Sequence, residues 1–259
     1  MVEQLLHCVK TQKLWVRFGG SQHLNKRLSN TLAVALLITS LAFTIRPAQA
    51  YPVAPSAQEA ATLSPLLRAA YQGKVQELKD LIRAGQTLSS TDTYGRTAVH
   101  LAAYARRHDV LRVLARAGAK LETFEKDRYD AVTIVGILGD EETLRVLLAL
   151  GASAQLITSI HYGTALIASA HHGHPGVVRQ LIAAGAPLDH VNILHWNAMI
   201  EAVVLGDGGQ RHQQVLKALL DAGANTRLTD RQGQTPLDLA RSREFTAMVK
   251  MLEAAQAGK

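Results

Sequence analysis

Apolar residues recur along most of the chain in short runs, and their spacing within each run is that of one face of a helix. Residues 110–114, 144–148 and 177–182 are the clearest examples, because their apolar positions lie one, three or four residues apart. This spacing is typical of amphipathic helices rather than of strands, in which apolar and polar residues alternate. The pattern therefore predicts a succession of short helices that pack against one another.

Glycines follow these apolar runs at a nearly constant interval. They are Gly85, Gly118, Gly151, Gly185 and Gly223, separated by 33, 33, 34 and 38 residues. Glycine adopts the left-handed conformation in which many helices end. The interval predicts a repeated unit of about 33 residues, and a fixed period of this length is the signature of a stacked repeat protein.

A residue suited to cap a helix lies twelve or thirteen positions after each glycine. These residues are Thr97, Asp130, Thr164, Asn197 and Thr235, and Ser64 begins an earlier copy. Their side chains can accept a hydrogen bond from a backbone N–H in the first turn, where that donor has no partner within the helix. Pro65 and Pro236 follow two of the caps, at a position where a helix tolerates proline. One copy cannot bury its apolar face alone, so the copies are expected to stack.

This order of a capped first helix, a second helix and a Gly-Ala pair before an extended hairpin resembles the ankyrin repeat. Residues Thr97 to His100, with the sequence Thr-Ala-Val-His, keep most of the family's helix-start motif. The resemblance covers residues 64–255 and implies an all-α fold, an α-solenoid of about six stacked helix-turn-helix and hairpin copies. We expect residues 51–63 to form a linker or an N-terminal cap and residues 256–259 a C-terminal tail.

The net charge of +7 is concentrated at the start of the chain. Residues 1–50 contain one acidic residue, Glu3, and six basic residues: Lys10, Lys13, Arg17, Lys26, Arg27 and Arg46. From residue 51 onward the chain has 22 basic and 20 acidic residues, taken from totals of 28 and 21. A body so close to neutral argues against a nucleic-acid partner.

The first 50 residues have the order of a secretory signal peptide. A basic segment ending in Arg27 precedes an apolar run at 32–45, and Ala48 and Ala50 form a small-residue cleavage motif. We expect cleavage after Ala50 and release into the periplasm or outside the cell, with no stable membrane anchor afterwards. An uncleaved anchor or a buried helix is the alternative. Cys8, the only cysteine, lies within the segment expected to be removed.

The resemblance also implies where a partner protein would bind, because ankyrin stacks use the hairpin tips and the exposed side of the first helix. The predicted protein-binding residues are Tyr71, Tyr94, Arg96, Tyr104, Tyr129, Ile137, Leu138, Tyr162, His171, His172, Leu194, Trp196, Val204 and Leu205. Ile193 extends this surface in the hairpins. Aromatic and large apolar side chains dominate interface energies. The alternative for individual rings is that they pack between neighbouring hairpins.

Histidines at 171, 172 and 174 raise a second possibility, a histidine-based metal or small-ligand site. His161, His190 and His195 are the candidate additional ligands, but no Asp, Glu or Cys lies close by in the sequence to complete a ligand set. Gly173-His174 also matches the turn between the two helices of an ankyrin repeat. We therefore expect no metal site and keep metal binding as the alternative.

The sequence contains no motif for a nucleophile, a nucleotide-binding loop or a metalloprotease helix. We expect a non-enzymatic protein with no cofactor. Exported bacterial proteins that it resembles are in some cases associated with catalase and oxidative-stress defence.

The fifth copy is longer at residues 206–211, which predicts either a tolerated insertion or a loop that contacts the partner.

Overall fold

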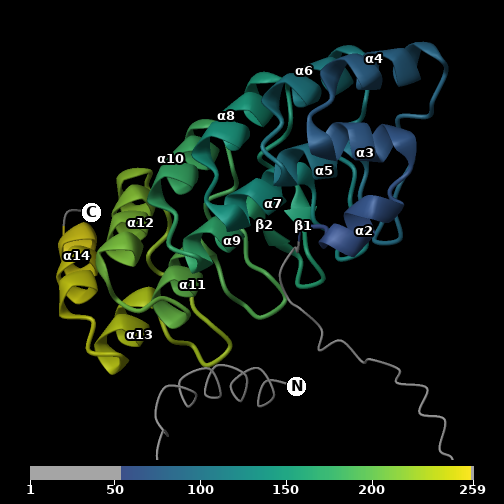
Figure 1. The fold of residues 1–259 in the computed structure, drawn as a ribbon. Coiled ribbons are helices and arrows are strands. Elements are labelled where there is room, and N and C mark those ends of the chain that lie inside the picture. The colour runs from purple at the N-terminus through teal and green to yellow at the C-terminus, as the bar shows by residue number, and fades with distance from the viewer. Residues whose placement is uncertain (1–53, 258–259) are drawn as a thin grey trace, which may run out of the picture. The chain divides into compact units, whose positions relative to one another are not determined.

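The computed structural model describes residues 54–257 (Figure 1). The expected signal peptide and its cleavage point lie outside the described residues. Within them, a first short helix, α2 (Ala57–Thr62), is followed by six helix pairs. The pairs are α3 (Pro65–Gln72) with α4 (Val75–Arg83), α5 (Ala98–Tyr104) with α6 (His108–Arg116), α7 (Ala131–Leu138) with α8 (Glu141–Ala149), α9 (Ala165–His171) with α10 (Pro175–Ala183), α11 (Ala198–Val204) with α12 (Gln210–Asp221), and α13 (Pro236–Ser242) with α14 (Thr246–Ala257).

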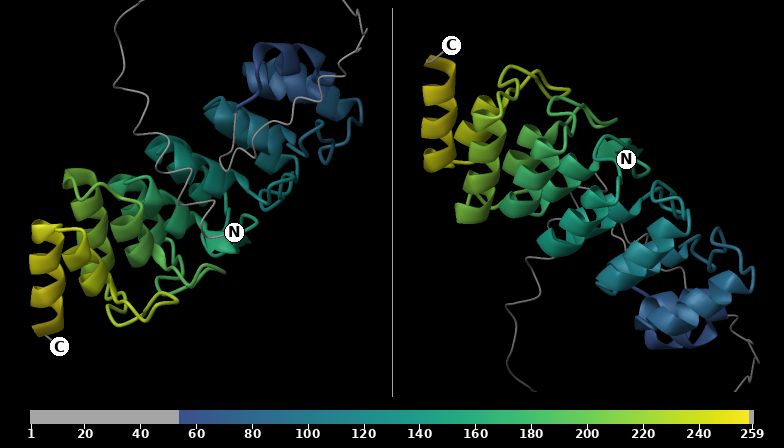
Figure 2. Two further views of the ribbon diagram at one scale, coloured as in Figure 1. Left: turned by 90° about the horizontal axis from the view of Figure 1, so that it is seen from below. Right: turned by 90° about the horizontal axis from the view of Figure 1, so that it is seen from above.

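These helices form two layers. The odd-numbered helices from α3 to α13 pack in sequence order in one layer, which we call the inner layer, and the even-numbered helices from α4 to α14 form the outer layer. Figure 1 shows them as two parallel rows, and Figure 2 shows the loops between repeats on one side of the stack. The all-α solenoid of six helix pairs predicted from the sequence is confirmed.

The core runs between the two layers along the whole stack. Each inner helix buries small side chains, among them Ala70, Ala103 and Ala170, which let consecutive helices approach closely. The outer helices supply larger side chains such as Leu114 and Leu147, which are fully buried. Each repeat therefore completes the core of its neighbours, as a quasi-one-dimensional fold requires.

The predicted helix starts are present, although the Ser64 side chain makes no cap bond at the start of α3. The Asp130 carboxylate accepts hydrogen bonds from the backbone N–H groups of Val132 (3.2 Å) and Thr133 (3.0 Å), and Asn197 Oδ1 accepts from Ile200 N–H at 2.9 Å. Thr164 and Thr235 cap their helices in the same way. The closing glycines adopt the expected left-handed conformation, with φ between 80° and 93° at Gly85, Gly118, Gly151, Gly185 and Gly223.

Residues 54–63 begin the described chain with a helix. Ser56 and Glu59 form a reciprocal capping box at its start, and Leu63 at its end is buried. The Tyr71 hydroxyl, on α3, donates to the Pro55 carbonyl at 3.5 Å. Helix α2 thus packs on the first repeat.

Hydrogen bonds link the hairpins between repeats into a row. Backbone N–H groups donate from Lys126 to the Tyr94 carbonyl (3.0 Å), from Ser159 to the Arg128 carbonyl (2.9 Å) and from Ile193 to the His161 carbonyl (3.1 Å). One hairpin contains a short antiparallel pair, β1 (Ile157–Thr158) and β2 (Gly163–Thr164). The row holds neighbouring hairpin tips in fixed positions.

The added length of the fifth copy is divided between a loop and a helix. Residues 205–209 connect α11 to α12, and residues 210–211 already belong to α12. The Arg243 side chain donates to the Gly206 carbonyl at 3.2 Å, and Gly208 lies against the Phe245 ring. Gly206 and Gly208 in this loop therefore contact the last repeat. Among residues 54–257, no helix is long and apolar enough to cross a membrane.

Candidate functional site

Large apolar side chains are exposed mainly at the tips of two neighbouring hairpins. Within the described residues, five of the six most exposed ones are Ile157, Ile160, Tyr162, Val191 and Ile193, with accessibilities of 37% to 58% for the whole residue. We call these five residues the hairpin patch. Leu138, at the end of α7, is the sixth. A soluble protein seldom exposes neighbouring apolar side chains without using them for binding.

The hairpin tips in the middle of the row carry large side chains in a backbone conformation that favours glycine. Arg128, Tyr162 and His195 have φ values of 64°, 55° and 63°, and each lies two residues before a helix cap. Gly95 and Gly233 occupy the same position in other copies. A side chain in this left-handed region costs roughly 1–2 kcal/mol. Such strained positions gather at functional sites, so these three side chains are candidates for a role in binding.

An arginine lies at each side of the patch. The Arg128 guanidinium lies 5.2 Å from the ring centre of Phe124 and 5.8 Å from that of Tyr162, so it joins two hairpins through cation–π contacts. On the other side, the Arg231 guanidinium donates to the Ile193 carbonyl. Both side chains lie on the surface.

One polar side chain in each hairpin fixes the shape of the tip. Asn192 Oδ1 accepts hydrogen bonds from the backbone N–H groups of Leu194 (2.9 Å) and Trp196 (3.0 Å). Asp92, Glu125, Ser159 and Asp230 make the corresponding pairs of bonds two and four residues ahead in their own hairpins. The tips are therefore preorganised by local bonds as well as by the bonds between hairpins.

The residues predicted to bind a partner differ in their exposure. Leu138 and Tyr162 are exposed, and Arg96 and Tyr129 are buried, with only 4% and 8% accessible. The half-buried ones are Tyr71, Tyr94, Tyr104, Ile137, His171, His172, Leu194, Trp196, Val204 and Leu205.

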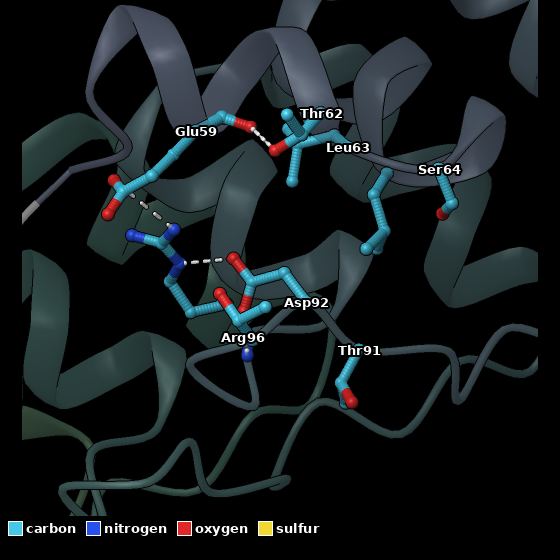
Figure 3. A pocket seen from close by; sticks show the side chains of 9 residues that line it. Glu59, Thr62, Leu63, Ser64, Thr91, Asp92 and Arg96 are labelled. Carbon is cyan, nitrogen blue, oxygen red and sulfur yellow. Dashed lines mark hydrogen bonds and ion pairs between the residues drawn. The ribbon is translucent and has the colours of Figure 1, made fainter.

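Arg96 and Tyr129 are therefore not on the exposed surface where the sequence analysis placed them. The Arg96 side chain turns to its own hairpin and to α2 rather than to solvent. Arg96 Nε donates to Asp92 at 2.6 Å, and its Nη2 lies 3.8 Å from the Glu59 carboxylate of α2 (Figure 3). The guanidinium also lies 4.7 Å from the centre of the Tyr94 ring.

Three patch residues, Ile157, Ile160 and Val191, were not among the predicted binding residues. A signal for two of them exists in the sequence, because the hairpin at 152–163 contains no Asp, Glu, Lys or Arg. A hairpin with two large isoleucines and no charge is unusual for a surface segment, and it marks the middle of the patch.

A cavity of about 400 Å³ lies beside α2 and the first hairpin. Glu59, Asp92 and Arg96 line it together with Thr62 and Ser64 (Figure 3). The two carboxylates already neutralise the guanidinium, so this cluster serves to join α2 to the first repeat.

The structure does not assemble the candidate histidine site. His174 Nε2 donates to the Ile137 carbonyl at 2.9 Å, and His212 Nε2 donates to the His171 carbonyl at 2.9 Å, so both nitrogens are used between repeats. The rings of His171 and His172 stack, with centres 4.6 Å apart, and burial lowers the pKa of each to about 4. In the part of the chain that the structure describes, no three His, Cys, Asp or Glu residues are placed to hold a metal ion.

A buried acid lies behind the hairpin that carries Ile193. Glu201, on α11, accepts a hydrogen bond from the Asn192 side chain through Oε1, and its Oε2 lies 3.5 Å from His171 Nδ1. Burial raises the pKa of Glu201 to about 8, so the carboxyl is protonated at neutral pH.

A two-layered stack of helix pairs, joined by a row of rigid hairpins with exposed apolar tips, defines a repeat protein of the interaction class. Comparisons with known families agree with this class. Residues 131–230 match a family described as ankyrin repeats in three copies, and residues 94–124 match a single ankyrin repeat. The chain belongs to the ankyrin-repeat family.

Known relatives extend the match over most of the chain. The chain is 31% identical over 192 residues to YahD of Escherichia coli (strain K12), which is described as an ankyrin repeat protein. This match covers 74% of this chain and 95% of YahD. The crystal structure of an ankyrin repeat domain from Acinetobacter baumannii AYE is 36% identical, with a TM-score of 0.70 over 74% of this chain and 97% of that one.

A second solved structure shares the fold alone. It is the complex of the predatory endopeptidase Bd0816 from Bdellovibrio bacteriovorus with the immunity protein Bd3460, with 20% identity and a TM-score of 0.60 over 74% of this chain and 98% of the matched one.

Ankyrin repeats are generally protein–protein interaction modules, and this family and fold are typically non-enzymatic.

Proposed function

We propose that this protein is an exported binding module that holds a partner protein against the tips of its hairpins and the adjoining face of its inner helices. The observation that carries the proposal is the hairpin patch. Its five large apolar side chains lie on adjacent hairpins that are joined by a backbone hydrogen bond from Ile193 to His161.

The rigidity of the row supports binding at this surface. Ordering loops and side chains reduces the affinity of an interface, and a surface that is already ordered avoids much of this loss. The tips of the patch are fixed by Ser159 and Asn192 and by the bonds between neighbouring hairpins. The half-buried ring of Trp196 lies in the same hairpin as Val191 and Ile193 and extends the apolar surface.

Export is supported by the order of charged and apolar residues in the first 50 positions. The test is N-terminal sequencing of the protein recovered from a periplasmic fraction. Export with cleavage predicts a chain that begins at Tyr51, and a chain that retains residues 1–50 in the cytoplasm contradicts it.

The resemblance-based link to catalase defence predicts that cells lacking the protein survive hydrogen peroxide less well. Unchanged survival contradicts that link.

Affinity capture from a periplasmic extract tests the binding proposal. One bait is the wild-type protein, and a second carries Ile160→Ser and Tyr162→Ser, which remove apolar surface without entering the core. A matched control carries Arg145→Ser and Arg179→Ser, exposed positions on the outer helices α8 and α10. The proposal predicts a protein that the wild type and the control retain and that the patch variant loses. Equal recovery with all three baits contradicts it.

A further inference from the structure

We infer that the hairpin patch accepts an extended segment of the partner protein in which apolar side chains are flanked on both sides by carboxylates. The inference rests on the proposed function and specifies the chemistry of the partner. It depends on the charges around the patch, which differ between its centre and its two sides.

The centre of the patch carries no charge, and each side carries an arginine. The hairpin at 152–163 contains no Asp, Glu, Lys or Arg. Arg128 lies on the preceding hairpin, with its guanidinium near Tyr162, and Arg231 lies on the hairpin beyond Ile193 and donates to its carbonyl. A ligand that crosses the patch therefore meets a guanidinium on either side of an apolar strip.

The carboxylates of the same hairpins are mostly turned to the backbone. Glu125 accepts from the N–H groups of Asp127 and Tyr129, Asp230 accepts from those of Gln232 and Gln234, and Asp189 accepts from that of Asn225 at 2.8 Å. Glu122 and Asp127 are exposed, and Lys120 and Lys126 in the same hairpin offset their charges. The outward charge at the sides of the patch is thus set by the arginines, which bind carboxylates strongly and with defined geometry.

An extended segment matches this arrangement. Alternate side chains of an extended chain point to the same face, so apolar residues can contact Ile160, Tyr162 and Ile193 in turn while flanking carboxylates reach the arginines. The strained tip residues support this assignment. Arg128, Tyr162 and His195 project from three consecutive hairpins, and each keeps its side chain where other copies have glycine.

Charge favours such a segment over a second copy of this chain. A symmetric dimer brings the same patch of both copies together, and its basic sides would then face each other. Acidic flanks on a different protein remove this repulsion and add attraction, which fixes the register of the bound segment.

Photo-crosslinking identifies what lies on the patch in the cell. The full chain is expressed with p-benzoylphenylalanine in place of Ile160, and a control carries the same residue in place of Arg145 on the outer layer. We expect crosslinks only from position 160, and we expect the crosslinked peptide, sequenced by mass spectrometry, to be an apolar segment with Asp or Glu on both sides.

The other outcomes overturn the inference in different ways. A crosslinked protein segment without flanking acids contradicts the inference and leaves the proposed function intact. A crosslink to a second copy of this chain or to lipid contradicts both, as does the absence of any crosslink.

A charge reversal then tests the two arginines directly. The purified Arg128→Glu, Arg231→Glu variant is compared with an Arg145→Glu, Arg179→Glu control for binding of a labelled peptide that has Leu, Ile and Phe between two pairs of Glu. We expect the reversal at the patch to weaken binding by about tenfold or more, and the control to bind like the wild type. Equal binding by both variants, or equal affinity for a peptide with Lys in place of Glu, overturns the inference.

Sedimentation with phosphatidylglycerol vesicles tests a membrane surface as the occupant of the patch. The protein is expected to stay in solution, and cosedimentation that requires Ile160 overturns the inference in favour of a membrane surface.

Discussion

The side-chain amide of Asn192 donates a hydrogen bond of 3.1 Å to Oε1 of Glu201. This contact joins the hairpin that carries Ile193 to the interior of the inner layer, because Glu201 lies on α11 and is almost completely buried. The same Asn192 side chain holds the hairpin tip through the backbone N–H groups of Leu194 and Trp196. A protonated acid therefore supports one half of the hairpin patch from behind.

Glu201 should make the stability of the protein fall as the pH rises from about 4.5 to about 8. Its pKa is about 8 in the folded state and 4.5 ordinarily, so between these values the folded protein holds a proton that the unfolded chain releases. The stabilisation is fully present below pH 4.5 and is lost as the pH rises through about 8, with each pKa unit equivalent to about 1.4 kcal/mol. Glu201→Gln keeps an acceptor for Asn192 and does not titrate. Urea unfolding followed by circular dichroism should show a smaller loss of stability between pH 4.5 and about 8 for the variant, and identical pH dependence in both proteins would contradict this assignment.

His100 should contribute the opposite dependence. Its Nδ1 accepts from the Thr97 N–H at 3.0 Å and its Nε2 donates to the Tyr129 carbonyl at 3.3 Å, which requires a neutral ring. Burial lowers its pKa from 6.5 to about 4, so stability is present above pH 6.5 and is lost as the pH falls toward 4. His100→Gln should lower the free energy of unfolding at neutral pH by roughly 1–3 kcal/mol, because buried polar groups lose partners. It should also reduce the acid dependence in part, since His171 and His172 titrate in the same direction. An undiminished acid dependence would argue against His100 as a source.

Arg96 is expected to act on stability rather than on binding. Its guanidinium is buried against Asp92 and Glu59, and removing one partner of a buried ion pair costs about 3–5 kcal/mol. Arg96→Ala should lower the free energy of unfolding by that order, whereas Arg145→Ala on the exposed face of α8 should change it by roughly 0.5 kcal/mol or less. Denaturant titration measures both. A variant at Arg96 that loses partner binding with unchanged stability would restore it to the binding surface.

The left-handed backbone conformation at His195 should lower the stability of the protein, and the His195 side chain should contribute to partner binding. His195 is exposed, and its φ of 63° is strained for a histidine. His195→Gly removes this strain, although glycine also makes the unfolded chain more flexible, so we expect a net stabilisation of about 0.5–1 kcal/mol together with weaker partner binding. Thermal unfolding and partner affinity are measured on the same sample. A variant that is less stable than the wild type, or that binds the partner equally well, would show that this side chain has no such role.

The repeat architecture could be predicted because its determinants are local. A cap such as Thr164 and a closing glycine such as Gly151 act within a few residues of their own positions, and their spacing alone gives the period. Stacking then follows from the apolar stripe on each helix. For this reason the all-α solenoid and its six helix pairs within residues 54–257 agree with the sequence analysis.

Exposure could not be predicted in the same way, because it depends on contacts between repeats. Arg96, Tyr129 and Trp196 share one position in the repeat, yet Arg96 and Tyr129 are buried and Trp196 is half-buried. The burial of Arg96 requires Glu59 on α2, in a segment for which the sequence analysis left a linker or a cap open. Ile160 and Val191 are exposed because their hairpin tips project beyond the inner helices. The absence of charge at 152–163 is a local signal for Ile160, but no local pattern reveals Val191.

The most direct test of the binding surface is the affinity of a captured partner for the wild-type protein and for the Ile160→Ser, Tyr162→Ser variant. Isothermal titration calorimetry measures both affinities at a temperature at which both proteins are fully folded. Our account predicts that the variant binds at least about tenfold more weakly, a loss of about 1.4 kcal/mol or more, while the Arg145→Ser, Arg179→Ser control binds like the wild type. Equal affinity of the patch variant and the wild type would contradict the account and place the binding surface elsewhere on the stack.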